Sequence, residues 1–366
     1  MIKGHSTSDG TVNFAKKSTA NQENFRKIQN LTLSNVGIGT YLGNPDSNTD
    51  ALVENAVKQS ILAGINVIDT AINYRFQKAE RSVGKAIATL INEEKINRDE
   101  VFISTKSGYV TNDGDINEDF WSYVNREYVK TGIIKPNDIS SGYNCMTVPY
   151  LEDQLNRSRK NLGLDCIDLI YLHNAVEGQI QDITKTQFME SLKDVFAFYE
   201  TQRQKGTIKF YGLATWDCFR VQNDDPQFLS LLDVLELAKQ VGGENHGFRF
   251  IQIPFNMYLD QAYMLKNQQA DGKNISILEA AKLYNIGVFT SVPLMQGKLL
   301  GPGVIPEFDN LKPSLRCLQF TRSTPGVLAP LVGHKLESHV SENLEIMRVP
   351  PISEDHFDEL VKKLTS

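Results

Sequence analysis

Four polar side chains stand at or just after the ends of apolar segments, where together they could move a proton. They are Asp69, Tyr74, Lys106 and His173. A charge at the end of an apolar strand is costly unless it is paired, so we expect the Asp69 carboxylate to hold the Lys106 ammonium. Groups with perturbed pKa values cluster at functional sites, so the four residues together predict an active site.

The chemistry that these residue types favour is proton transfer to a carbonyl oxygen. We expect the Lys106 ammonium to favour the phenolate of Tyr74 and thus to lower the pKa of this phenol. Tyr74 can then give its proton to a carbonyl oxygen and take it back in the reverse direction. His173 can donate a second hydrogen bond to that oxygen and stabilise the charge that builds up on it.

Two other interpretations fit single residues of this set. An ordinary buried Asp–Lys pair, a histidine with satisfied hydrogen bonds and a surface tyrosine would explain each residue alone, but not why all four follow apolar runs. A strand-end lysine can also act as a nucleophile, which makes a Schiff-base aldolase using Lys106 a further hypothesis. A lysine beside a carboxylate stays protonated, however, and this disfavours the aldolase.

Short apolar runs, separated by longer amphipathic stretches, predict the elements that position these residues. Each run has the length of a strand and most do not alternate, as expected for strands that are buried on both faces. Their number and spacing favour a (β/α)8 TIM barrel, with a doubly wound sheet as the alternative. The expected strands are residues 33–39, 65–69, 101–105, 166–172, 208–213, 250–253, 287–290 and 330–333. The expected helices include residues 51–63, capped by Asp50, and residues 150–161, 228–241 and 276–284.

The chain is expected to hold one domain, a (β/α)8 barrel over residues 31–366. A polar extension, residues 1–30, precedes it and is expected either to cap the barrel bottom or to lack fixed structure. A long loop at about residues 107–149 shows no clear strand or helix pattern, but its aromatic residues argue against simple disorder. It follows the third expected strand, which would place it at the C-terminal face of a barrel, where sites form.

The composition of the chain limits which partners and metal sites we expect. The net charge is −6 and no long block of lysine and arginine occurs, so we expect no nucleic acid partner. No apolar stretch approaches the ~18 residues of a membrane span, and the polar start has no signal-peptide core. The four cysteines lie far apart without CxxC spacing, which favours reduced thiols in the cytoplasm and no metal site. His334 and His339 lack a metal-binding frame and are expected at a solvated helix start.

The segments around the four residues resemble the aldo-keto reductase superfamily. Residues 69–75, 80–87, 101–106 and 165–173 resemble its D-T-A-x-x-Y, E-x-x-x-G-x-A-I/L, V-F-I-x-T-K and D-x-I-D-L-x-x-x-H segments. The Asp, Tyr, Lys and His of the family's catalytic tetrad all have matches here. The likeness extends over roughly residues 31–347, through segments similar to the family's first strand, Q-x-P/E-Y-N strand, S-P-L-x-x-G loop and closing G-x(8)-E-N segment.

This resemblance implies an oxidoreductase without a Rossmann domain. Hydride would pass from C4 of the nicotinamide to an aldehyde or ketone, and Tyr74 would supply the proton. The implied cofactor is NADPH, with NADH possible, and the implied partner is a small-molecule carbonyl substrate. The matching cofactor-binding positions are Thr40, Thr215, Gln252, Pro293, Leu294, Gly297, Gly333, Lys335, Glu342 and Asn343. Tyr41, Phe76 and Trp216 are candidates to line the substrate pocket, although aromatic residues are as often core.

The sequence departs from the family pattern at several of these positions. Ala214 and Thr215 stand where a Ser-Asn pair often anchors the carboxamide, and Ser291 replaces an aromatic that stacks on the nicotinamide. The usual arginine for the adenosine 2′-phosphate is missing near Leu336, where Lys335 offers only a point charge. These departures support a second hypothesis, a nicotinamide-binding regulatory barrel with little turnover.

Overall fold

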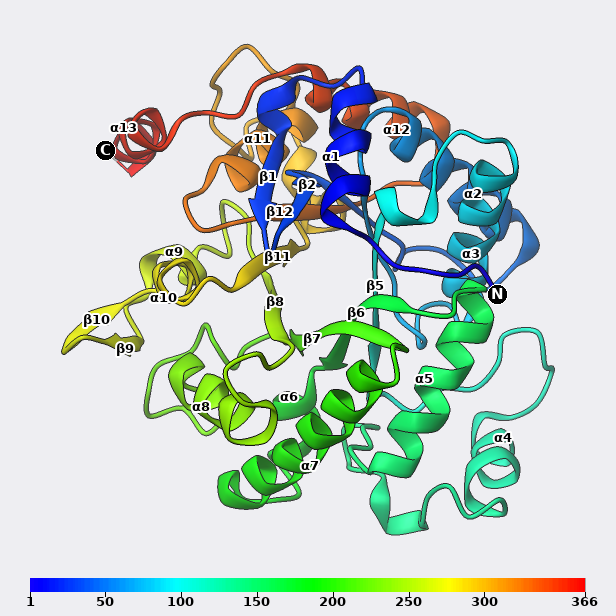
Figure 1. Cartoon of the computed structure of the whole chain (residues 1–366). Coiled ribbons are helices and arrows are strands. Elements are labelled where there is room, and N and C mark those ends of the chain that lie inside the picture. Colours follow the sequence, from blue (N-terminus) through cyan, green and yellow to red (C-terminus); the bar gives the residue numbers. More distant parts are fainter. Residues whose placement is uncertain (366) are drawn as a thin grey trace.

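Eight parallel strands close into a barrel in the computed structural model, which describes residues 1–365 (Figure 1). Around the barrel the order is β11-β12-β3-β4-β5-β6-β7-β8. The strands are β3 (Gly37–Gly39), β4 (Val67–Asp69), β5 (Phe102–Ser107), β6 (Ile167–His173), β7 (Ile208–Ala214), β8 (Phe248–Pro254), β11 (Gly287–Ser291) and β12 (Ala329–Gly333). The predicted (β/α)8 barrel is confirmed, and the doubly wound sheet is wrong.

Bulky side chains fill the interior of the barrel. Phe102, Phe250 and Phe289 lie together there, with ring centroids 5.3 Å apart for the first two and 5.8 Å for the last two. Leu169 and Leu331 belong to the same buried cluster. The barrel is therefore a packed core, and a ligand must bind at one of its ends.

Helices surround the barrel and bury their apolar faces against the outside of the strands. The helices of eight or more residues that follow the barrel strands are α2 (Ser47–Leu62), α3 (Lys78–Asn92), α5 (Val148–Leu162), α7 (Lys185–Gln204), α8 (Leu231–Gly242), α11 (Pro313–Ser323) and α12 (Glu337–Leu344). The expected cap at Asp50 is wrong. Helix α2 begins earlier, where the Asp46 carboxylate accepts from the Thr49 N–H, and Asp50 in its first turn pairs with Arg75 instead.

The first 30 residues have a defined structure. Helix α1 (Ser8–Lys17) lies beside a hairpin of β1 (Phe25–Ile28) and β2 (Leu31–Ser34) (Figure 1). The two leucines of β2 pack into the interior cluster near the starts of the barrel strands, so the hairpin closes the barrel bottom. The expected strand 33–39 is therefore two strands, because the chain leaves the antiparallel hairpin before it enters the parallel barrel as β3.

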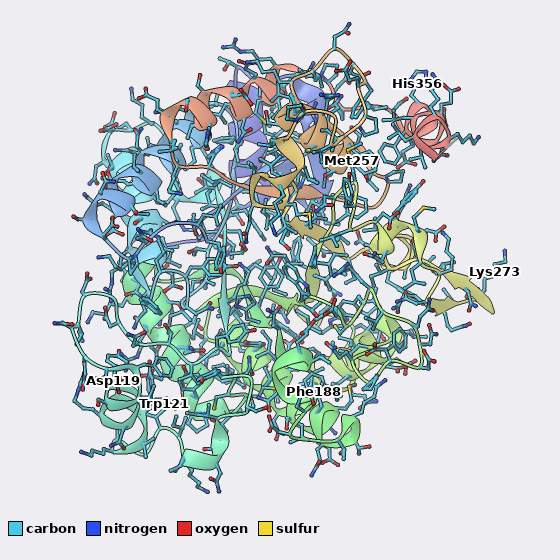
Figure 2. The ribbon with its side chains drawn as sticks, turned by 180° about the vertical axis from the view of Figure 1, so that it is seen from behind. Asp119, Trp121, Phe188, Met257, Lys273 and His356 are labelled. Carbon is cyan, nitrogen blue, oxygen red and sulfur yellow. The ribbon has the colours of Figure 1, made fainter. Side chains whose placement is uncertain are left out.

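The loop after β5 contains short helices and a small core of its own. It includes α4 (Phe120–Val124), a π-helical turn (Asn125–Val129) and a 3-10 turn (Pro136–Asp138). Tyr123 and Tyr128 are buried in its core, whereas Trp121 is exposed. Figure 1 shows α4 outside α5, and Figure 2 shows Asp119 and Trp121 at the periphery of the molecule. The sequence shows no clear strand or helix pattern in this loop because its elements are too short to give one.

The remaining elements lie outside the ring of barrel strands. They are the 3-10 turns Gln22–Asn24, Arg98–Glu100 and Glu345–Arg348, the irregular turn Met295–Leu300, α6 (Ala175–Gln179), α9 (Gln261–Met264), β9 (Gln268–Ala270), β10 (Lys273–Ile275), α10 (Ile277–Leu283) and α13 (Glu354–Thr365). The β9–β10 hairpin projects from the body of the molecule, with Lys273 at its edge in Figure 2. Within residues 1–365, none of the helices combines the length and apolarity that a membrane span requires.

Candidate active site

A cavity of about 670 Å³ lies at the C-terminal ends of the barrel strands. Every barrel strand contributes to its wall a residue from its last positions. These residues are Gly39, Asp69, Lys106, His173, Ala214, Gln252, Ser291 and Gly333. Active sites of (β/α)8 barrels form at this face because loops and strand ends from the whole barrel converge there.

The four residues singled out by the sequence all line this cavity. Lys106 Nζ lies 2.5 Å from Asp69 Oδ2 and 2.8 Å from the carbonyl oxygen of Thr70, so the expected ion pair is confirmed. The same nitrogen lies 4.6 Å from the centre of the Tyr74 ring. The Tyr74 and His173 rings meet edge to face, with centroids 5.9 Å apart.

A turn with unusual backbone conformations brings Tyr74 to this position. The next three residues, Arg75, Phe76 and Gln77, have φ values of 48°, 53° and 74°, in the left-handed region that non-glycine residues avoid. The Arg75 guanidinium holds the turn by donating to Asp50 at 2.6 Å and to Ser82 at 2.9 Å. Backbone strain of this kind persists where the surrounding contacts over-determine it, often at functional sites.

The environment sets different protonation states for the three proton-carrying residues. Burial raises the pKa of Tyr74, and this outweighs the opposite effect of the Lys106 ammonium. The expected lowering of the Tyr74 pKa by Lys106 is therefore present, but burial sets the net direction of the shift. Burial alone would lower the pKa of Lys106, but the Asp69 carboxylate and Tyr74 raise it. Burial, with a further effect of Lys106, lowers the pKa of His173 well below its usual value.

These shifts define what the site can do near neutral pH. Tyr74 keeps its proton, Lys106 stays charged and His173 is neutral. A proton donor thus stands beside a cation that can stabilise the phenolate left after donation. The charged lysine also argues against Lys106 as a Schiff-base nucleophile.

The ten sequence-predicted cofactor positions all line the same cavity. Of the three candidate substrate residues, Tyr41 and Trp216 line it as well. Phe76 does not. The left-handed turn directs Tyr74 toward the cavity, whereas the backbone of Phe76 contacts the long loop through a hydrogen bond from the Gly114 N–H. The Phe76 side chain is 41% exposed.

A model of the aldo/keto reductase family matches residues 35–307, well over half of the chain. The chain belongs to the aldo/keto reductase family. Among curated proteins, it is 25% identical over 197 residues to the NADH-specific methylglyoxal reductase of Escherichia coli K12, covering 52% of this chain and 51% of that protein. It is 24% identical over 253 residues to the uncharacterized oxidoreductase YtbE of Bacillus subtilis 168, covering 69% of this chain and 62% of that protein. The matches thus span about half of the first relative and less than two thirds of the second.

Solved aldo-keto reductases share the fold. The holo form of AKR11C1 from Bacillus halodurans superposes with a TM-score of 0.61 at 17% identity, covering 92% of this chain and 95% of that one. An aldo/keto reductase from Klebsiella pneumoniae, solved with NADP and acetate, superposes with a TM-score of 0.59 at 18% identity. The match covers 93% of this chain and 95% of that one. At such identities the likeness concerns the fold alone.

This aldo/keto reductase also has cavity residues that the sequence reasoning missed. Tyr109 and Asn174 line the cavity, and the Asn174 amide donates to the Tyr109 hydroxyl at 3.2 Å. The Tyr109 ring also meets that of His173, with centroids 5.0 Å apart. Both follow the ends of barrel strands within two residues, which is the signal that would have identified them.

The two histidines near β12 line the cavity rather than lying only at a solvated helix start. His334 is buried, and its Nε2 lies 2.9 Å from the Ser60 hydroxyl, while its Nδ1 lies 3.4 Å from the Asn343 amide nitrogen. Burial lowers the pKa of His334 to about 4. A neutral His334 can therefore orient Asn343. Among the described residues, no group of three or more His, Cys, Asp or Glu side chains is placed to hold a metal ion.

Proposed function

We propose that this chain is an NAD(P)H-dependent oxidoreductase that reduces an aldehyde or ketone to an alcohol, or catalyses the reverse reaction. The observation that supports this most directly is the arrangement of the Tyr74 ring beside the Lys106–Asp69 ion pair and His173 in one cavity. The family, and relatives described as oxidoreductases, agree with this chemistry.

The cavity offers groups that fit a nicotinamide carboxamide. The Gln252 amide nitrogen faces Asp69 Oδ2 at 3.3 Å, which fixes the orientation of this amide because a carboxylate accepts only donors. Gln252 Oε1 is buried and has no hydrogen-bond partner, so it can accept an N–H of the carboxamide. Thr215 lines the cavity beside it. When bound, the reduced nicotinamide supplies a hydride from C4.

The remaining cofactor positions would hold the rest of the dinucleotide. Gly297, with a φ of 87°, lines the cavity with Pro293 and Leu294, and its N–H donates a hydrogen bond to the Leu294 carbonyl at 2.8 Å. Lys335 supplies one positive charge for a 2′-phosphate, so we expect NADPH to be preferred while NADH still binds. Glu342 and Asn343 would contact the adenosine.

In the reduction, the protein's own residues would manage the proton. His173 and Tyr74 would both donate hydrogen bonds to the carbonyl oxygen and thereby orient the carbonyl. Tyr74 would then transfer its proton to this oxygen as negative charge builds up there. Lys106, kept charged by Asp69, would stabilise the resulting phenolate until it regains a proton.

Replacing the proton donor tests this proposal directly. We expect Tyr74→Phe to lower kcat for an aromatic aldehyde by about 10²- to 10⁴-fold, the contribution of a positioned general acid. The dissociation constants of NADPH and NADH should change less than about twofold, because only a hydroxyl is lost. Cofactor binding is followed by intrinsic fluorescence and turnover by the absorbance of the reduced nicotinamide. Full turnover in a folded Tyr74→Phe variant would contradict the mechanism.

A second candidate function is a nicotinamide-binding barrel with a regulatory role and little turnover. Ala214 and Ser291 favour it, because neither can reproduce the anchoring and stacking that the family pattern provides there. Tight NADPH binding by the wild-type protein without turnover on a broad carbonyl panel would favour this function. If neither NADPH nor NADH binds, both candidate functions are wrong.

A further inference from the structure

Glu177 forms a dense set of hydrogen bonds beside the cavity without lining it. It lies in the short helix α6, four residues after His173. Its Oε1 accepts from the Thr215 hydroxyl at 2.5 Å. The same oxygen accepts from three successive backbone N–H groups, those of Trp216 at 2.8 Å, Asp217 at 2.6 Å and Cys218 at 3.4 Å. Successive N–H groups of this kind form an anion-binding nest, and here a carboxylate of the same chain fills it.

Helix α6 itself is fixed on two sides, so Glu177 has a defined position. The Asn174 N–H donates to the Ala214 carbonyl at 2.6 Å, which ties the start of α6 to the end of β7. On the other side, a Cβ on Gly178 would lie 2.7 Å from Cβ of Asn144, so the long loop packs directly against α6. The Gln179 amide also donates to Asn144 Oδ1 at 3.1 Å. Glu177 therefore joins the catalytic histidine segment to the loop after β7.

The hydrogen bond to Glu177 decides what Thr215 can offer to the cavity. A hydroxyl has one proton, and the short contact with a carboxylate commits it to Glu177. The Thr215 oxygen, which also lies 3.0 Å from Cys218 Sγ, is then left with acceptor capacity only. The Cys218 N–H occupies one of its two lone pairs at 3.3 Å, and the other remains for a ligand. Gln252 Oε1, buried and unpartnered, is also an acceptor. This side of the cavity thus presents two acceptors, which suits the two N–H groups of a primary amide.

Glu177 also fixes Trp216, which stands at the rim of the cavity with 45% of its surface exposed. The Trp216 N–H is bound to Glu177, and the Trp216 carbonyl accepts from the Arg220 guanidinium at 2.9 Å. Both polar groups of the Trp216 backbone are thereby held. An exposed indole would otherwise move with its loop.

We propose that Glu177 is a positioning residue for the site: it orders residues 215–218 so that Thr215 accepts a carboxamide N–H and Trp216 is held at the cavity rim. The part that concerns the carboxamide rests on the proposed function. The part that concerns Trp216 does not, and this allows the two to be tested separately.

The test uses the full chain with Trp216 as a reporter. The protein has two tryptophans, and Trp121 is exposed outside the cavity, so Trp121→Phe leaves Trp216 as the single indole. In this background we compare Glu177→Ala, Glu177→Gln and the control Glu190→Ala, which removes an exposed glutamate from α7. The measurements are the emission maximum, acrylamide quenching and the dissociation constant of NADPH.

We expect Glu177→Ala to shift Trp216 emission to the red, to raise the quenching constant about twofold and to weaken NADPH binding roughly tenfold, the effect of about one lost charge-assisted hydrogen bond. Glu177→Gln keeps an acceptor oxygen and should show smaller changes of the same sign, about threefold for NADPH. Glu190→Ala should match the background protein.

Two results would overturn the proposal. One is a folded Glu177→Ala protein whose emission, quenching and NADPH affinity equal those of the background, even if its melting temperature is lower, because the role would then be structural only. The other applies if Glu177→Ala does not fold: an unchanged Glu177→Gln protein then contradicts the proposal. If the wild-type protein binds no NADPH, the proposed function and the carboxamide role of Glu177 both fail, while emission and quenching still decide the role of Glu177 toward Trp216.

Discussion

Tyr74, Lys106 and His173 share one cavity, but different forces set their charges. Burial is the largest effect on each, and it favours the neutral form. Only Lys106 has a carboxylate in contact, and Asp69 keeps it charged against this effect. A neutral phenol, a cation and a neutral imidazole can therefore coexist within a few ångströms, as acid catalysis near neutral pH requires.

The pH dependence of turnover follows from these states. Reduction needs a protonated Tyr74 and a neutral His173, and the two pKa values are shifted away from neutrality in opposite directions. We expect kcat/KM for reduction to be flat between about pH 6 and about pH 9. Alcohol oxidation needs a deprotonated Tyr74 and should rise with pH over the same range. If raising the pH abolished reduction with an apparent pKa below about 8, the assignment of Tyr74 as a proton donor with a raised pKa would be contradicted.

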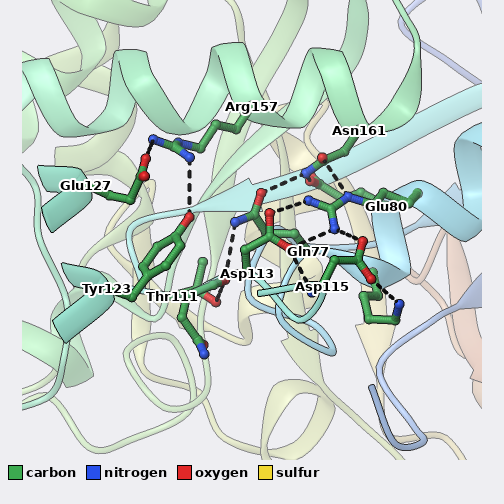
Figure 3. A network of polar contacts seen from close by, with 12 residues as sticks. Gln77, Glu80, Thr111, Asp113, Asp115, Tyr123, Glu127, Arg157 and Asn161 are labelled. Carbon is green, nitrogen blue, oxygen red and sulfur yellow. Dashed lines mark hydrogen bonds and ion pairs between the residues drawn. The ribbon is translucent and has the colours of Figure 1, made fainter. Parts of the chain in front are cut away.

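At the scale of elements, ion pairs attach the long loop to the barrel (Figure 3). Asp113 of the loop receives two hydrogen bonds from Arg81 of α3, at 2.8 and 2.7 Å. Arg157 of α5 donates to the Tyr123 hydroxyl at 3.3 Å and to Glu127 at 3.1 Å. The loop is thus held from two helices, which fits its small core and its contact with α6.

Removing one of these attachments should loosen the loop without unfolding the barrel. We expect Arg81→Ala to speed tryptic cleavage within residues 120–136 several-fold, because local opening becomes easier there. The free energy of unfolding should fall by only about 1 kcal/mol, since Arg81 is partly exposed. Lys85→Ala, in the same helix but 74% exposed, serves as the control. Equal cleavage rates for the two variants would show that Arg81 does not hold the loop.

At the scale of the whole molecule, the two ends of the barrel have different roles. The mouth holds the cavity, whereas the bottom is closed by the β1–β2 hairpin and α1. The Thr11 hydroxyl accepts from the Thr32 N–H at 3.0 Å, and Phe14 is 3% exposed. In a barrel, residues at the bottom serve stability and those at the mouth serve chemistry.

A substitution at the bottom should therefore change stability alone. We expect Phe14→Ala to lower the free energy of unfolding by about 3 kcal/mol, as for other large-to-small changes of a buried phenylalanine. The dissociation constant of NADPH should stay the same, because the cavity lies at the opposite end. Urea denaturation measures the first quantity and fluorescence titration the second, with Lys16→Ala as an exposed control. If the free energy of unfolding fell by less than about 1 kcal/mol, the N-terminal extension would contribute little to the stability of the fold.

The sequence alone determined the barrel and the residues at its mouth. Strands buried on both faces need continuous apolar runs, and the polar residues that end them are visible without any knowledge of the fold. Lys106 and His173 could be placed at strand ends for this reason, and Asp69 could be paired with Lys106.

Only the tertiary structure decided the features that depend on distant neighbours. The net pKa shift of Tyr74 depends mainly on burial by many side chains, so the effect of Lys106, although predicted with the correct sign, does not decide it. The outward position of Phe76 follows from a left-handed turn, which the ion pair between Arg75 and Asp50 holds in place. Asp50 lies 26 residues before Phe76 in the sequence. Glu177 gave no sequence signal, because its role arises only where α6 meets the loop after β7. Such contacts join residues far apart in the chain, and local sequence patterns carry no record of them.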